Sequence, residues 1–205
     1  MARDTQSIAK MSRREGYALH PKAHKILAKR TTIPGGQKKA GRPATLSQYA
    51  IQLREKQKVK RLYGLLEKQF SNLMREALNK KGPSGELLLQ FLEQRLDSVL
   101  YRSGFANSRR SARQLATHGH FMLNGKKVDI PSIRLMPNDE IVIKTPSKTN
   151  NYFKNIDEVS PKPSDIPSWI KVDRKKFQIS IVGLPSREEA EPEINEQLIV
   201  EYYSR

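Results

Sequence analysis

One dipeptide, Asn124-Gly125, constrains the fold of this chain more than any other local feature. It lies between two short runs of strand type within residues 121–128. Both residues of such a dipeptide readily adopt positive φ, and the resulting turn matches the twist of the two strands that it joins. The sequence therefore predicts a β-hairpin at this position.

Helical periodicity precedes the hairpin. Apolar residues recur at three- and four-residue steps over residues 87–100, which predicts one core-facing helix that ends at Gly104. Ser108 can cap a second, short helix, and Gly119 stands where a helix commonly ends in a left-handed residue. After the hairpin, residues 136–144 are typical of a turn followed by a strand. We therefore expect two helices packed on a small twisted sheet.

The short helix carries three arginines near its start. At 100° per residue, Arg109, Arg110 and Arg113 share one arc with Thr117, whereas the apolar residues fall on the opposite side. Arginine offers planar, multidentate donors that match phosphate geometry. A solvated charged face is the alternative. Since no acidic residue lies between residues 105 and 128, we expect no internal counter-charge and favour RNA.

The charge of the chain is strongly basic and uneven. Lys and Arg number 38 against 21 acidic residues, a net charge of +17. Residues 1–63 hold 16 basic and 3 acidic residues, residues 64–146 hold 13 and 8, and residues 147–205 hold 9 and 10. Such an excess favours a polyanion or an anionic membrane surface as partner. The basic helices leave no broad apolar face for lipid, so we prefer nucleic acid.

The basic N-terminal part predicts little regular structure before Thr45. A disordered extension is one interpretation, and an extension ordered by RNA is the other. His20 and His24 lack a third ligand, so we expect no metal site there, and the absence of cysteine excludes disulfides and thiolate ligands. Thr45 and Gln48 fit a capping box, so a helix is expected to begin there and to break near residue 64.

The last third of the chain changes character. Residues 147–169 are expected to form a connector, and two alternating runs within residues 169–181 predict strands. The acidic stretch that follows is interpreted as a solvated turn, with a protein-facing surface as the further possibility. The candidate protein contacts are Glu188, Glu189 and Glu191.

Several motifs resemble a known family. Residues 95–143 resemble the small RNA-binding domain named after ribosomal small-subunit protein four, which also occurs in some pseudouridine synthases, tyrosyl-tRNA synthetases and a heat-shock RNA-binding protein. The segments ARD…SRREG, LSQYAIQLREKQKVKRLYG and INEQLIVEYYSR are similar to the bacterial-type protein four family itself. Together these motifs extend from Met1 to Arg205.

The resemblance implies an α+β fold. It comprises a basic N-terminal extension (1–45), a mainly helical body (46–92 and 147–205) whose C-terminal segment is short and β-rich, and an inserted two-helix and hairpin RNA-binding domain (93–146). Some relatives hold zinc through N-terminal cysteines, which this chain lacks. The family's Pro-Gly-Gln-His-Gly-like loop appears here as residues 34–38 without the histidine, which changes the expected local RNA contacts.

The resemblance also implies a function. It predicts a non-enzymatic constituent of the small ribosomal subunit, without cofactor or metal, that binds a five-way-junction region of ribosomal RNA and nucleates assembly of the subunit body. The expected neighbours are small-subunit proteins five and three and the messenger RNA where it enters the subunit. Translational accuracy would depend on these contacts. The expected location is the cytoplasmic ribosome, in a bacterial cytosol rather than an organelle, with no membrane contact.

The candidate RNA-binding residues are mostly basic and come from every part of the chain except the last third. They are Arg3, Arg13, Arg14, Lys38, Lys39, Arg42, Arg54, Lys56, Lys58, Lys60, Arg61, Tyr63, Arg95, Arg102, Asn107, Arg109, Arg110, Arg113, Gln114, Thr117, His118, His120, Asn124 and Lys126.

Two other classes of protein contain the same small domain and give rival functions. A pseudouridine synthase would need a catalytic domain, and the roughly sixty residues after Lys144 are too few for one. A stand-alone RNA chaperone or stalled-ribosome factor needs little beyond the small domain. That interpretation would leave the basic N-terminal part and the characteristic ending unexplained.

Overall fold

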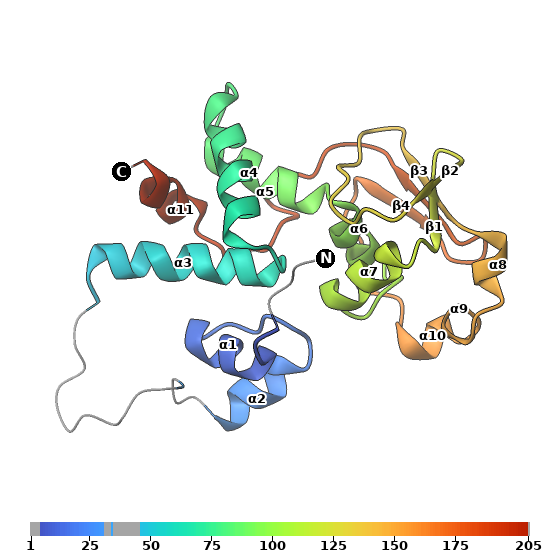
Figure 1. Ribbon diagram of the computed structural model, residues 1–205, viewed down its shortest axis with the longest axis horizontal. Helices are drawn as coiled ribbons and strands as arrows, with labels where there is room; N and C mark the ends of the chain where they lie inside the picture. Colours follow the sequence, from blue (N-terminus) through green and yellow to red (C-terminus); the bar gives the residue numbers. More distant parts are fainter. Residues whose placement is uncertain (1–4, 31–33, 35–45, 205) are drawn as a thin grey trace. The chain divides into compact units, whose positions relative to one another are not determined.

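The computed structural model describes residues 5–30, 34 and 46–204, and it is α+β as expected (Figure 1). The chain divides into two compact units, which are described separately. Unit 1 comprises residues 1–88 and 193–205, and unit 2 comprises residues 89–192. The helices of unit 1 are α1 (Ile8–Glu15), α2 (Ala23–Lys29), α3 (Gln48–Leu62), α4 (Glu67–Asn79) and α11 (Glu196–Tyr203). Helix α5 (Ser84–Glu93) runs from unit 1 into unit 2.

Helix α3 begins and ends at identifiable signals. The Ser47 hydroxyl accepts a hydrogen bond from the Ala50 amide at 3.3 Å, so Ser47 is the N-cap. Thr45, which was expected to cap this helix, lies outside the described residues. Gly64 adopts φ +63° between α3 and α4, which confirms the predicted break. Only glycine adopts this backbone conformation without steric cost.

The C-terminal helix α11 packs along α3. The Gln52 side chain donates a hydrogen bond to Glu201 at 2.7 Å, and the Asn195 amide donates to Glu55 at 2.9 Å. The Asn195 side chain in turn caps α11. The chain therefore ends in a helix, so the expectation of a β-rich C-terminal segment holds only for residues before 182.

Unit 2 is built on one antiparallel sheet of five strands in the order β2-β1-β3-β5-β4. The strands are β1 (Phe121–Leu123), β2 (Lys126–Val128), β3 (Glu140–Ile143), β4 (Ile170–Asp173) and β5 (Gln178–Ile181). Leu123 pairs with Lys126 across a turn in which Asn124 and Gly125 have φ values of 49° and 78°. This turn confirms the predicted hairpin.

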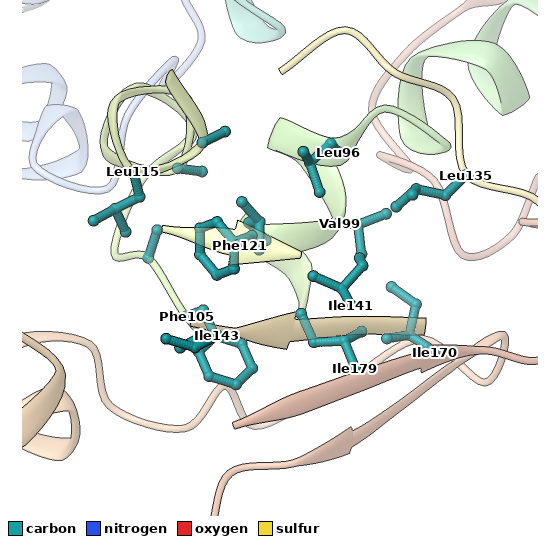
Figure 2. Close-up of a cluster of buried hydrophobic side chains, with 14 of the residues drawn as sticks. Leu96, Val99, Phe105, Leu115, Phe121, Leu135, Ile141, Ile143, Ile170 and Ile179 are labelled. Atoms are coloured by element: carbon teal, nitrogen blue, oxygen red, sulfur yellow. The ribbon is translucent and has the colours of Figure 1, made fainter. Parts of the chain in front are cut away.

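Two helices, α6 (Leu96–Arg102) and α7 (Arg109–Thr117), supply the other half of the unit 2 core. Leu96 and Val99 from α6 and Leu115 from α7 pack with strand residues such as Phe121 and Ile141 (Figure 2). Each of these side chains is buried. The core therefore depends on apolar residues that recur with helical spacing before the hairpin and with strand spacing after it.

The prediction of a single helix over residues 87–100 is wrong in one respect. It is broken between α5 and α6, because the backbone there bonds to another segment. The Leu96 amide donates to the Ile133 carbonyl, and the Leu135 amide donates to the Gln94 carbonyl, both at 2.9 Å. These tertiary hydrogen bonds replace the intrahelical ones and leave no local sequence signal.

Strands β4 and β5 join the same sheet as the hairpin. Ile179 of β5 pairs with Ile141 of β3, and both side chains are buried. The connector between β3 and β4 contains three short helices, α8 (Thr145–Lys148), α9 (Asn151–Lys154) and α10 (Ile156–Val159). The structure therefore groups residues 147–192 with the small domain, whereas the expected division assigned them to the helical body. The open edge of β3 is the physical reason.

Candidate nucleic-acid interface

Helix α7 is positioned by two local signals and one buried face. The Ser108 hydroxyl accepts a hydrogen bond from the Ser111 amide at 3.2 Å, and Gly119 adopts φ +68° just after the helix. Ala112, Leu115 and other apolar residues face the core. The predicted cap, end and apolar side of this helix are confirmed.

The arginines of α7 do not share one exposed face. Arg113 donates to the buried carboxylate of Asp97 through Nε at 3.0 Å and Nη2 at 2.7 Å. Arg95 donates to the same carboxylate through Nε at 3.0 Å and Nη2 at 2.9 Å. Only 5% of the Asp97 side chain is exposed. Asp97 therefore holds α7 on the start of α6 by accepting from two guanidinium groups.

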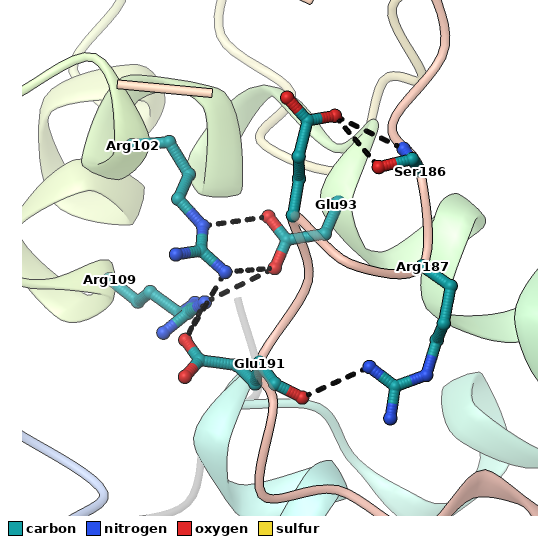
Figure 3. Close-up of polar contacts among 7 residues, drawn as sticks. Glu93, Arg102, Arg109, Ser186, Arg187 and Glu191 are labelled. Carbon is teal, nitrogen blue, oxygen red and sulfur yellow. Dashed lines mark hydrogen bonds and ion pairs between the residues drawn. The ribbon is translucent and has the colours of Figure 1, made fainter. Parts of the chain in front are cut away.

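A second ion-pair cluster surrounds Arg109 (Figure 3). Its guanidinium lies 2.9 Å from Glu191 and 3.5 Å from Glu93. Arg102 makes two hydrogen bonds to Glu93, at 3.1 and 2.8 Å, and also lies 3.3 Å from Glu191. Arg109 also stacks over the Tyr101 ring, with its Cζ atom 4.7 Å from the ring centroid. Two carboxylates thus neutralise two guanidinium groups.

The expectation that the arginine helix has no internal counter-charge is therefore wrong. The acidic partners lie outside residues 105–128, at positions 93, 97 and 191, so the local sequence could not reveal them. Arg95 in particular is 6% exposed, which places it inside the unit. Arg95, Arg102, Arg109 and Arg113 hold unit 2 together, whatever else they contact.

An outward face remains on α7 and the hairpin. Arg110, Gln114 and Thr117 are spaced at four and three residues, and all three are exposed. His118 and Lys126 are also exposed. Hydrogen bonding to RNA requires accessible donors, which Arg110, Gln114 and Lys126 supply. The Thr117 hydroxyl instead donates to the Arg113 carbonyl at 2.7 Å. The remaining members of the predicted set near this face are exposed as well, namely Asn107 and Asn124.

The two histidines at the α7–β1 turn have different surroundings. His120 is partly buried, with Nδ1 3.0 Å from the Ser147 hydroxyl and its ring against Phe153. Burial lowers the pKa of His120, and the charges of His118 and Lys144 lower it further. His120 is therefore held neutral to a lower pH than an ordinary histidine, whereas His118 lies at the surface.

Basic side chains of α3 in unit 1 also have acidic partners. Arg61 and Arg54 both bond to Glu15, whose side chain is fully buried. Burial raises the pKa of Glu15 despite these cations. Arg54 keeps 47% of its side chain exposed, so it can reach a further ligand. Tyr63, another predicted contact, is buried in the core.

Glu67 joins the start of α4 to α3. Its carboxylate lies 2.6 Å from Lys56 and 2.9 Å from Lys60, and it also accepts from the Tyr203 hydroxyl at 3.1 Å. Burial raises the pKa of Glu67, but the hydrogen bonds and charges of the two lysines outweigh it and lower the pKa to about 2. Lys58 similarly lies 2.8 Å from a carboxylate, that of Glu55.

The acidic C-terminal stretch forms turns, as expected, but two of its glutamates are bonded internally rather than solvated. Glu189 accepts from the Ser168 amide at 2.6 Å and from the Ser186 hydroxyl at 3.1 Å. Glu191 lies in the ion-pair cluster of Figure 3. Glu188 is exposed, and it is the predicted protein contact that stays accessible.

The N-terminal candidates fall into two groups. Arg3, Lys38, Lys39 and Arg42 lie outside the described residues. Arg13 and Arg14 are on α1 and are partly buried.

Among the residues that the structure describes, no group of three His, Cys, Asp or Glu side chains could hold a metal ion. In the same residues, no helix is long and apolar enough to cross a membrane.

Comparison with known proteins shows the family to which this chain is related. The profile described as "Ribosomal protein S4/S9 N-terminal domain" matches residues 3–93, and the profile "S4 domain" matches residues 94–141. The chain is 49% identical to small ribosomal subunit protein uS4 of Pelodictyon phaeoclathratiforme and 48% identical to that of Chlorobaculum tepidum. It is 45% identical to that of Chloroflexus aurantiacus. Each alignment covers the whole of both chains.

Proposed function

Because the chain belongs to the uS4 family of small ribosomal subunit proteins, we propose that direct contacts with folded ribosomal RNA hold it in the subunit. It is a structural constituent of the small ribosomal subunit and binds ribosomal RNA. A role in subunit assembly and in translational accuracy is typical of the family. The observation that carries this conclusion is the full-length identity of 45–49% to proteins of that name.

The accessible donors of unit 2 define the proposed RNA face. Arg110, Gln114 and Lys126 point away from the core of the unit, whereas Arg109 and Arg113 are engaged with internal acids. Contacts to phosphate release counterions and supply affinity that does not depend on base sequence. Recognition of a folded RNA then comes from its shape and from its 2′-hydroxyls more than from base edges in a helix.

The second contact region lies in unit 1 and the N-terminal extension. Arg3, Lys38, Lys39 and Arg42 belong to the most basic part of the chain. Arg54 on α3 adds an accessible guanidinium. Because two linked binding regions raise each other's effective concentration, both would contribute to one overall affinity.

The finer partners belong to the same proposal. We assign to this chain a five-way junction of the small-subunit RNA and contacts with small-subunit proteins five and three. We also place it near the channel through which messenger RNA enters. Glu188 supports the protein contact because its carboxylate is exposed while Glu189 and Glu191 are bonded internally. The proposed site of action is the ribosome of a bacterial cytoplasm.

The proposed mechanism is non-enzymatic. The buried carboxylates Glu93 and Asp97 of unit 2 are paired with arginines, and these ion pairs hold the fold together. An RNA-modifying enzyme built on the same small domain is the rival. Incubation of the chain with small-subunit RNA, followed by chromatographic separation of the nucleosides, would support that rival only if a new modified nucleoside appeared.

Binding to a defined RNA tests the proposal. The full chain is titrated into a transcript of the junction region of small-subunit RNA, and into a perfect duplex of equal length as control. We expect at least tenfold tighter binding to the junction, with affinity falling steeply as salt rises. Equal affinity for both RNAs at all salt concentrations would contradict specific recognition and leave only nonspecific attraction.

A further inference from the structure

Two lysines of unit 2 without an acidic partner among the described residues lie close together, away from the arginine clusters. Four arginines are bonded to Asp97, Glu93 and Glu191. Lys127 on β2 and Lys144 at the end of β3 have no ion pair with any residue that the structure describes. These two lysines were not among the predicted RNA contacts.

Both lysines lie at the turn between α7 and β1. A Cβ atom added to Gly119 would lie 3.1 Å from Cε of Lys127 and 3.9 Å from Nζ of Lys144. The strands explain this arrangement. Lys127 pairs with Met122 in the hairpin, and the Lys144 amide donates to the His120 carbonyl at 3.0 Å. The edge strand and the third strand of the sheet thus bring two lysine side chains to the same glycine from opposite sides of β1.

Two histidines and one carboxylate complete the surroundings of this turn. His118 is exposed, and its ring centroid lies 5.9 Å from that of His120. The charges of His118 and Lys144 both act on His120. Asp129 is the acidic residue at the turn, and its Cβ lies 3.8 Å from where a Cβ at position 119 would stand. It lies beyond ion-pair distance of either lysine, and its side chain is exposed.

Convergence of like charges costs free energy in the isolated protein. Two ammonium groups that approach each other repel, and the repulsion is relieved when an anion binds between them. The glycine has two effects here. Its φ of +68° allows the sharp turn, and its lack of a side chain lets the Lys127 side chain pack close to the backbone, where a Cβ would lie 3.1 Å from Cε of Lys127.

We propose that Lys127 and Lys144, converging on the Gly119 turn, bind one phosphate group of the RNA backbone. This inference rests on the proposed RNA-binding function and names a contact within it. It adds two lysines beside the hairpin to the proposed RNA face of Arg110, Gln114 and Lys126. Asp129 opposes the bound phosphate and weakens the site.

The test uses charge-removing variants of the full chain with the junction RNA. Lys127→Gln and Lys144→Gln should each weaken binding roughly three- to tenfold and reduce the slope of log affinity against log salt by about one. Lys127→Arg and Lys144→Arg keep the charge and should restore most of the affinity. Asp129→Asn should have the opposite effect to the glutamine variants and tighten binding about twofold or more.

A matched control is Lys171→Gln. Lys171 is exposed on β4, at the other edge of the same sheet, and it has no ion pair with a described residue. Its replacement should leave affinity and slope unchanged. Far-ultraviolet circular dichroism and thermal melting should show the same fold for all variants, since none of the side chains concerned is buried in the core.

The outcomes distinguish the phosphate site from the RNA-binding function. If the unchanged chain does not prefer the junction RNA, the proposed function fails. If it prefers the junction but the Lys127 and Lys144 variants bind like Lys171→Gln, the phosphate site is refuted and the function stands. A loss of affinity that the arginine variants do not restore would also refute the site, because the effect would then not be one of charge.

Discussion

Replacement of Asp97 by alanine removes the acceptor at the centre of unit 2. Asp97 accepts from Arg95 and Arg113, each through Nε and Nη2, at distances of 2.7–3.0 Å. The Asp97 and Arg95 side chains are only 5% and 7% exposed, so water cannot replace the lost partner of Arg95. Breaking a buried ion pair by removing one partner typically costs about 3–5 kcal/mol.

The single tryptophan offers the assay. Trp169 is 4% exposed and belongs to the core of unit 2, so its fluorescence reports unfolding of that unit. A loss of about 3–5 kcal/mol lowers the urea midpoint by at least about 1 M at the usual slope for domains of this size. Asp97→Asn keeps the shape of the side chain and removes its charge, and it should fall between the wild type and Asp97→Ala.

Asp157→Ala is the matched control for this measurement. Asp157 lies 3.1 Å from Arg174, but its side chain is 87% exposed. Exposed pairs of this kind contribute about 0–1 kcal/mol, so the urea midpoint should barely change. Equal midpoint shifts for Asp97→Ala and Asp157→Ala would show that burial does not govern the energy of the Asp97 cluster, and would refute its stabilising role.

Three further predictions concern local features. Ser108→Ala removes the α7 cap and should lower the free energy of unfolding in urea by about 1 kcal/mol. Ser108→Asp can still cap the helix and should retain most of that stability. Gly104→Ala should destabilise unit 2 by more than about 1 kcal/mol, because position 104 has φ +75° and an added Cβ would lie 2.3 Å from Pro163. The pKa of Glu67 is lowered to about 2 in the fold. Its contribution to stability is therefore full above about pH 4.5 and is lost as the pH falls towards 2. The difference in melting temperature between the wild type and Glu67→Gln should shrink over that interval, and a constant difference would contradict the assigned pairing.

Local signals predicted local structure. The hairpin at Asn124-Gly125, the cap at Ser108 and the left-handed Gly119 each depend on a few neighbouring residues, and all three are confirmed. The two strands after the connector were also predicted from alternation. Backbone conformation of this kind is set by residue type and short-range hydrogen bonds, which a sequence displays directly.

Long-range pairing was not visible in the sequence. Arg109 meets Glu191 across 82 residues, and the break before Leu96 follows from hydrogen bonds to residues 133–135. The union of β3 with β5 spans the whole connector. No local pattern marks such partners. The absence of acidic residues near the arginines in the sequence therefore did not show that the arginines lack ion-pair partners, since the fold brings acidic residues from distant positions.

The proposed RNA face has fewer exposed residues of α7 than helix spacing alone predicts. Of the expected arc, Arg110 and Thr117 are exposed, while Arg109 and Arg113 turn towards carboxylates. Helix periodicity places side chains on a side of the helix, but a long guanidinium reaches past that side to a charged partner. Exposure and ion pairing therefore decide which members of a basic helix stay available to RNA.

Chemical footprinting of small-subunit RNA, followed by sedimentation of the complex, tests the central claim most directly. The full chain is mixed with protein-free small-subunit RNA at moderate salt, and nucleotide reactivity is compared with and without it. We predict cosedimentation and protection of one discrete junction that persists in excess competitor RNA. Diffuse protection that the competitor removes would contradict the claim that this chain is a specific ribosomal RNA-binding constituent.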